Sequence, residues 1–269
     1  MGSAGNVFVA ESANHRIQKF DSAGNYLLKW GKNGGDGTSG SGDGEFNNPT
    51  HLAGGSMGLY VADTLNNRVQ RFNAGGVFQD KWGSSGTGDG QFNQPGGIAV
   101  DSSNYIYVVD KFNQRIQRFQ ESGSGVTFVS KWGSLGSGDS QFISPSGIAV
   151  DNASHIFVAD SGNNRIQEFS TAGNLLRKWG KNGGDGTSGS GQGEFNYPSD
   201  IAVDSSGNVF VIDSSNHRIQ EFDNNGNYLN QWQRPSYDLM GGLCFDASDK
   251  LYVTINNTGV NDYVFTFIP

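Results

Sequence analysis

Two nearly identical glycine-rich segments are the first feature of this sequence that could do chemistry. They read KWGKNGGDGTSGSGDGEFN at 29–47 and KWGKNGGDGTSGSGQGEFN at 178–196, and each contains GDGTSG, which fits the G-x-G-x-x-G pattern that holds a dinucleotide pyrophosphate. A phosphate loop needs either a following Gly-Lys-Ser/Thr or the N-terminus of a helix, and the sequence supplies neither. We therefore interpret both segments as long connections and predict no nucleotide site.

Calcium binding is the second chemistry to weigh, because the segments carry several carboxylates. Read as an EF-hand loop from Asp36, the sixth position is Ser41 and the twelfth is Asn47, where glycine and glutamate are needed. Read as a calcium-binding nonapeptide, GGDGTS lacks the aspartate of its sixth position. A weak calcium site using Asp36, Asp43 or Glu45 stays an open alternative, and we assign no metal ligand and no cofactor.

An acidic residue and an arginine five positions later recur along the chain and look catalytic in isolation. Each acid ends a short apolar run, and each arginine stands in an N-x-R-[IV]-Q string. The five pairs are Glu11/Arg16, Asp63/Arg68, Asp110/Arg115, Asp160/Arg165 and Asp213/Arg218. A guanidinium can bind a carboxylate through two parallel hydrogen bonds and so tie the two ends of a loop together. Because the pair is used five times, we interpret it as structural and assign no catalytic residue.

The pairs belong to a repeat whose arginines are spaced by 52, 47, 50 and 53 residues. Each full unit predicts four short strands, which in the fourth unit run over 147–151, 155–160, 165–169 and 175–179. Gly, Asn, Asp and Ser between the strands are typical of hairpin turns. In the third strand, RIQEF, Ile166 and Phe169 fall on opposite faces, so this sheet must be covered on both sides, as in stacked propeller blades.

The ordered motifs are a Pro-led IAVD strand, a VAD strand, N-x-R-I-Q and a strand ending near Trp-Gly. Together they resemble the NHL repeat family over essentially the whole chain. The resemblance implies an all-β, six-bladed β-propeller of four-stranded antiparallel blades in a single domain, 1–269. The first and last blades are expected to be incomplete, with 22 strands in all, and the missing pair would lie upstream of Met1. The expected blades are 1–47, 48–92, 93–142, 143–195, 196–235 and 236–269.

Five candidate ligand-binding residues follow from the propeller prediction. The long connections and the tips between second and third strands share the rim where propellers usually bind ligands. At these tips Leu65 and Phe112 are apolar where water is expected, and Lys111 precedes the latter. The third residue of the Pro-led strand lines the channel mouth. Glycine is usual there, and His51 and Asp200 are polar exceptions three units apart, placed to hold opposite ends of a small ligand.

Composition limits the class of partner. Eighteen Lys and Arg against 26 Asp and Glu give a net charge of −8, which disfavours nucleic acid and anionic membranes. No apolar run approaches 18 residues, so no membrane span is expected. The single cysteine excludes an internal disulfide framework. We expect a monomer. Few cysteines and abundant Gly, Ser and Asn suit an exported bacterial or archaeal surface protein, and the sequence leaves the compartment open.

Two classes of function remain. The leading hypothesis is a non-catalytic scaffold that presents a loop-rich rim to a protein, peptide or glycan partner. The alternative is a lyase or hydrolase acting at the channel mouth, with His51 and Asp200 as the residues to test. NHL-like amidating lyases bind zinc through several channel histidines. This chain has four histidines in total, which the repeat pattern places at different positions. RNA binding is disfavoured by the charge.

Overall fold

A computed structural model describes residues 5–123, 125–233, 239–256 and 263–267. Across these residues 22 strands form six antiparallel sheets, four of four strands and two of three strands. This confirms an all-β propeller built from four-stranded antiparallel blades. The chain divides into two compact units, Met1–Lys131 and Trp132–Pro269.

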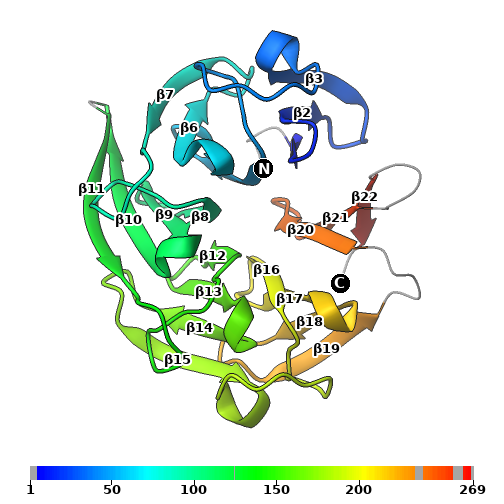
Figure 1. Ribbon diagram of the computed structural model, residues 1–269. Coiled ribbons are helices and arrows are strands. Elements are labelled where there is room, and N and C mark those ends of the chain that lie inside the picture. Colours follow the sequence, from blue (N-terminus) through cyan, green and yellow to red (C-terminus); the bar gives the residue numbers. More distant parts are fainter. Residues whose placement is uncertain (1–4, 124, 234–238, 257–262, 268–269) are drawn as a thin grey trace. The chain divides into compact units, whose positions relative to one another are not determined.

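The first unit holds three sheets whose strands follow chain order (Figure 1). Strands β4 and β8, which open the two four-stranded sheets, lie side by side. The strands are β1 (Val7–Glu11), β2 (Arg16–Phe20) and β3 (Tyr26–Gly31); β4 (Pro49–Gly55), β5 (Gly58–Asp63), β6 (Arg68–Phe72) and β7 (Phe78–Trp82); and β8 (Pro95–Val100), β9 (Tyr105–Asp110), β10 (Arg115–Ser122) and β11 (Gly125–Trp132). Single-turn 3-10 helices in this unit are η1 (Lys32–Gly34), η2 (Thr64–Asn66) and η3 (Lys111–Asn113).

The second unit repeats the arrangement, with β16 lying beside both β12 and β20. Its strands are β12 (Ile148–Val150), β13 (Ile156–Asp160), β14 (Arg165–Phe169) and β15 (Leu175–Gly180); β16 (Pro198–Val203), β17 (Val209–Asp213), β18 (Arg218–Phe222) and β19 (Tyr228–Gln233); and β20 (Leu239–Phe245), β21 (Leu251–Asn256) and β22 (Tyr263–Phe267). Its 3-10 turns are η4 (Ser161–Asn163), η5 (Lys181–Gly183) and η6 (Ser214–Asn216). The strands expected in the fourth repeat are thus present, with ends shifted by at most one residue.

Strand β14 shows how the sheets are held together. On one face Phe169 packs against Trp132 and Phe142, with ring centroids 5.8 Å apart in both contacts. On the other face Ile166 belongs to a buried cluster that includes Phe222 of the next sheet. The prediction that this strand is apolar on both faces and covered on both sides is therefore confirmed. Burying such faces is the main force that stacks one sheet on the next.

Candidate functional site

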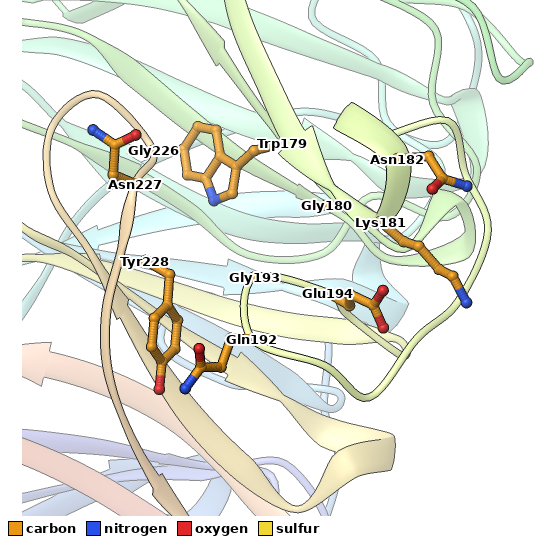
Figure 2. A pocket seen from close by; sticks show the side chains of 10 residues that line it. All are labelled: Trp179, Gly180, Lys181, Asn182, Gln192, Gly193, Glu194, Gly226, Asn227 and Tyr228. Atoms are coloured by element: carbon orange, nitrogen blue, oxygen red, sulfur yellow. The ribbon is translucent and has the colours of Figure 1, made fainter.

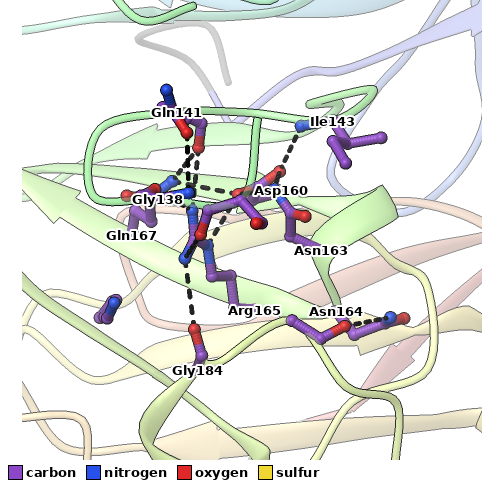
Figure 3. Close-up of polar contacts among 12 residues, drawn as sticks. Gly138, Gln141, Ile143, Asp160, Asn163, Asn164, Arg165, Gln167 and Gly184 are labelled. Carbon is purple, nitrogen blue, oxygen red and sulfur yellow. Dashed lines mark hydrogen bonds and ion pairs between the residues drawn. The ribbon is translucent and has the colours of Figure 1, made fainter. Parts of the chain in front are cut away.

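Five of the six sheets carry an acid–arginine pair at a strand tip, and Asp160 with Arg165 is the most buried example (Figure 3). The carboxylate of Asp160 accepts hydrogen bonds from the guanidinium Nε at 2.8 Å and from the Ile143 backbone N–H at 2.9 Å. The side-chain amides of Asn163 and Gln167 donate to it as well. Burial raises the pKa of Asp160, and the bonds from Ile143, Asn163 and Arg165 act in the opposite direction.

The remaining guanidinium N–H groups of Arg165 donate to backbone carbonyls. Nη1 donates to Ser137 and Gly184, and Nη2 donates to Gly138 at 2.6 Å and to Gln141 at 2.9 Å. The arginine thus joins the acid at the end of one strand to two separate connecting loops. A rigid fork of five donors suits this task, because each buried carbonyl needs a partner.

The other four pairs are also ion-paired, with one difference in exposure. The distances are 2.8 Å for Glu11/Arg16, 2.7 Å for Asp63/Arg68, 2.7 Å for Asp110/Arg115 and 2.8 Å for Asp213/Arg218. The Arg16 and Glu11 side chains are 21% and 13% exposed. In every pair whose acid is an aspartate, including Asp160/Arg165, that side chain is fully buried. These contacts support a structural role for the pairs.

The glycine-rich connections turn their carbonyl groups towards these arginines. In the first, the Arg68 guanidinium donates to the carbonyls of Ser41, Gly42 and Glu45 at 2.7 to 2.9 Å. In the second, the Arg218 guanidinium donates to the carbonyls of Ser190, Gly191 and Glu194 in the same way. A phosphate-binding loop presents N–H groups to its anion. Carbonyls gathered around a cation are the opposite arrangement, which agrees with the prediction that these segments are connections.

The carboxylates inside these connections are engaged by their own loop. Asp36 accepts hydrogen bonds from the hydroxyl and the N–H of Thr38 and from the Asn33 amide. These bonds, led by the Thr38 hydroxyl, lower the pKa of Asp36 to about 2. Asp185 repeats the arrangement with Thr187, and its pKa is also lowered to about 2. Over the described residues no group of three or more His, Cys, Asp or Glu is arranged to hold a metal ion.

The residue before each repeat arginine adopts a left-handed conformation, and Asn67 and His15 also bond to the connection that leads into the next sheet. Asn67 has φ of 53°, and its side-chain oxygen accepts the N–H of Gln94 at 2.8 Å. His15, with φ of 48°, uses Nδ1 to accept the N–H of Asn48 at 2.9 Å. Asn and His tolerate this conformation better than most residues. The Nδ1 atom of His15 therefore has a structural role.

The strand tips carry the predicted apolar residues on the surface. Leu65 in η2 is 42% exposed and Phe112 in η3 is 47% exposed. Their backbone N–H groups donate to the carbonyls of Asn47 and Asn93 at 3.0 and 3.1 Å, so both tips are tied to the preceding connection. The Lys111 ammonium lies 5.8 Å from the centre of the Phe112 ring. Both tips therefore have a hydrogen-bonded backbone and a side chain that faces solvent.

His51 and Asp200 lie in β4 and β16, each in a different unit, and each is bonded to the strand beside it. His51 Nδ1 accepts the N–H of Ile98 at 3.2 Å, and Asp200 Oδ2 accepts the N–H of Leu243 at 2.8 Å. Asp200 is only 3% exposed. A polar side chain here therefore connects the first strands of consecutive sheets.

A solvent-open cavity of about 420 Å³ lies in the second unit, between the end of β15, the second glycine-rich connection and the turn before β19 (Figure 2). The turn at 226–228 borders one side, and Lys181, Asn182 and Glu194 border the other. The sequence patterns did not single out Gln192, which also lines it. Comparing the two glycine-rich copies position by position would have drawn attention to that residue.

The comparisons with known proteins agree with this architecture. The family model described as NHL repeat matches residues 142–169 and 195–222, and a model described as a 6-bladed beta-propeller matches 56–127. Protein lin-41 of Caenorhabditis elegans is 48% identical over 46 residues, which is 17% of this chain and 4% of that protein. The chain therefore matches only a small part of this curated relative.

Solved structures resemble the whole chain in fold at low identity. Virginiamycin B lyase from Staphylococcus aureus has a TM-score of 0.64 at 18% identity and covers 94% of this chain and 74% of its own. A gluconolactonase from Xanthomonas campestris also scores 0.64, at 15% identity, covering 93% and 79%. A chain of the nidogen/laminin complex scores 0.62 at 15% identity, covering 98% and 93%. Enzymes and proteins held in complexes thus share this fold. The structure contains no helix long and apolar enough to cross a membrane within its described residues.

Proposed function

Because the chain belongs to the NHL-repeat proteins, we propose that it is a non-catalytic six-bladed scaffold that binds a protein, peptide or glycan through its strand tips. One observation carries this proposal: aligned tips of neighbouring sheets present Leu65 and Phe112 on hydrogen-bonded backbone, with 42% and 47% of these residues exposed. Rigid apolar anchors lose little conformational entropy when a partner covers them, so they are effective contact residues.

Other tips fit their surroundings differently, which supports a specific role for these two. At the aligned tip position of β13–β14, Gly162 faces Ile143, and a Cβ atom added to the glycine would lie 2.4 Å from the isoleucine side chain. In η2 and η4 the first residues, Thr64 and Ser161, donate their hydroxyls to the carbonyls of Pro95 and Pro198, so on this point η3 alone differs from these two tips. Lys111 has no hydroxyl, and its ammonium stays beside the Phe112 ring. The tip of η3 therefore combines a cation with an aromatic ring.

The experiment is selection of ligands from a displayed peptide library and a glycan array, followed by affinity measurement on Leu65→Ser/Phe112→Ser. The proposal expects ligands whose binding falls on the order of tenfold or more in the double variant, with an unchanged melting temperature. Val77→Ser is the matched control, since Val77 is 58% exposed and lies in the β6–β7 turn, at the other end of β6 from η2. Ligands that bind the tip variant as tightly as the unsubstituted protein contradict the proposal.

Catalysis at the channel mouth is the alternative function, and the enzymes among the fold relatives keep it testable. The bonds from His51 to Ile98 and from Asp200 to Leu243 favour a structural role for both residues. A screen of lactone, ester and lyase substrates tests the alternative. Turnover that disappears in His51→Ala, with the fold retained, would support an enzyme over a scaffold.

A further inference from the structure

We propose that the cavity at the second glycine-rich connection is a binding site for an uncharged sugar residue. It lies in the second unit and stands independently of the tip contacts in the first unit. Ten residues line it, among them the aromatic side chains of Trp179 and Tyr228 and the amides of Gln192 and Asn227. The charged lining residues are one lysine and one glutamate, so the wall carries no net charge.

The duplicated connection supplies a comparison within one molecule. Seven of the ten lining residues are identical at the aligned positions of the first copy. The three that differ are Gln192, Asn227 and Tyr228, which replace Asp43, Val77 and Phe78. Every one of these differences places a neutral hydrogen-bonding group where the first copy has a charge or a hydrocarbon.

With Gln192 in place of aspartate, the second copy lacks an ion pair that the aligned loops form with the outermost strand of their sheet. Asp43, Asp89 and Asp139 hold Lys81, Lys131 and Lys178 of the outermost strand of their sheet in ion pairs of 2.5 Å. In the second copy both partners are glutamines. Gln231 turns to accept a hydrogen bond from Arg218, and Gln192 makes no hydrogen bond to any residue that the structure describes. Its amide therefore stands in the cavity wall with donors and an acceptor available.

These groups match the chemistry of a sugar. A pyranose has hydroxyls that both donate and accept hydrogen bonds, and amide and phenol groups satisfy both roles. Its C–H face is apolar and packs on aromatic rings. The half-buried Tyr228 ring is the one available for such a contact, because Gly226 packs on the Trp179 indole and leaves that side chain only 8% exposed. A charged ligand would instead need the unbalanced charge that this wall lacks.

The test is NMR titration of the whole chain with the methyl glycosides of glucose, galactose, mannose and N-acetylglucosamine. We expect at least one to shift the amide signals of Gly193 and Gly226, with a dissociation constant on the order of 1 mM. Two variants copy residues that the chain already uses elsewhere: Gln192→Asp/Gln231→Lys and Asn227→Val/Tyr228→Phe. Both should fold, and each should weaken binding on the order of tenfold.

Two outcomes would refute the proposed sugar site. If none of the four glycosides shifts these signals, or if shifts occur only elsewhere, the sugar site is refuted. Binding that is unchanged in both double variants refutes it as well. Leu65→Ser/Phe112→Ser should leave glycoside binding intact, so failure of the tip proposal and failure of this one are distinguishable.

Discussion

Removing the guanidinium of Arg165 should be among the most damaging single changes in the second unit. The side chain is fully buried and donates to Asp160 and to four carbonyls. Arg165→Ala leaves a buried carboxylate without its counter-ion, which costs about 3–5 kcal/mol of unfolding free energy. At about 2–4 °C per kcal/mol for a protein of this size, the melting temperature should fall by roughly 10 °C.

Arg16→Ala is the control variant, because it breaks the same kind of ion pair at a partly exposed position. Arg16 is 21% exposed, its partner Glu11 is 13% exposed, and its other bond, to Gly35, is long at 3.4 Å. Water can replace these contacts, so the expected loss is about 1 kcal/mol. Urea unfolding followed by tryptophan fluorescence and circular dichroism measures both variants. If the two lie within about 1 kcal/mol of each other, burial of the arginine does not set its contribution, and the reasoning fails.

Three further predictions concern single groups. The pKa values of Asp36 and Asp185 are lowered to about 2, so their contribution to loop order is complete above about pH 4 and is lost as the pH falls through about 2. Amide hydrogen exchange at Thr38 and Thr187 should therefore become faster over that pH range. Protection that persists at about pH 2 would contradict this prediction. Burial raises the pKa of the Cys244 thiol to about 11. Iodoacetamide should therefore alkylate this thiol at pH 8 on the order of a hundredfold more slowly in the native protein than in the unfolded protein. Equal alkylation rates would disprove this prediction. Ser161→Ala should cost about 1 kcal/mol by removing the 2.6 Å bond to Pro198, measured by urea unfolding, and a change near zero would show that the bond is unimportant.

The repeat pattern made the strands and the five ion pairs predictable. Strand β14 begins and ends where RIQEF does, because apolar residues on both faces leave little choice of register. The role of the arginine towards the connecting loops was not predictable. Its carbonyl partners, such as Ser137 and Gly138, lie 27 or 28 positions away, and backbone carbonyls carry no sequence signal.

The candidate sites were predictable only in part. Exposure of Leu65 and Phe112 follows from their place at strand tips. The partners of His51 and Asp200 do not, because a backbone N–H on the neighbouring strand is invisible in sequence. The 3-10 turns at the tips were also missed, since three residues are too few to show helical periodicity.

Hydrogen exchange with a selected ligand bound tests the proposed scaffold function most directly. The account predicts slowed exchange in the tips at 63–67 and 110–114, since Leu65 and Phe112 lie there. Protection confined to the starts of β4 and β16, around His51 and Asp200, would contradict it and place binding at the channel mouth.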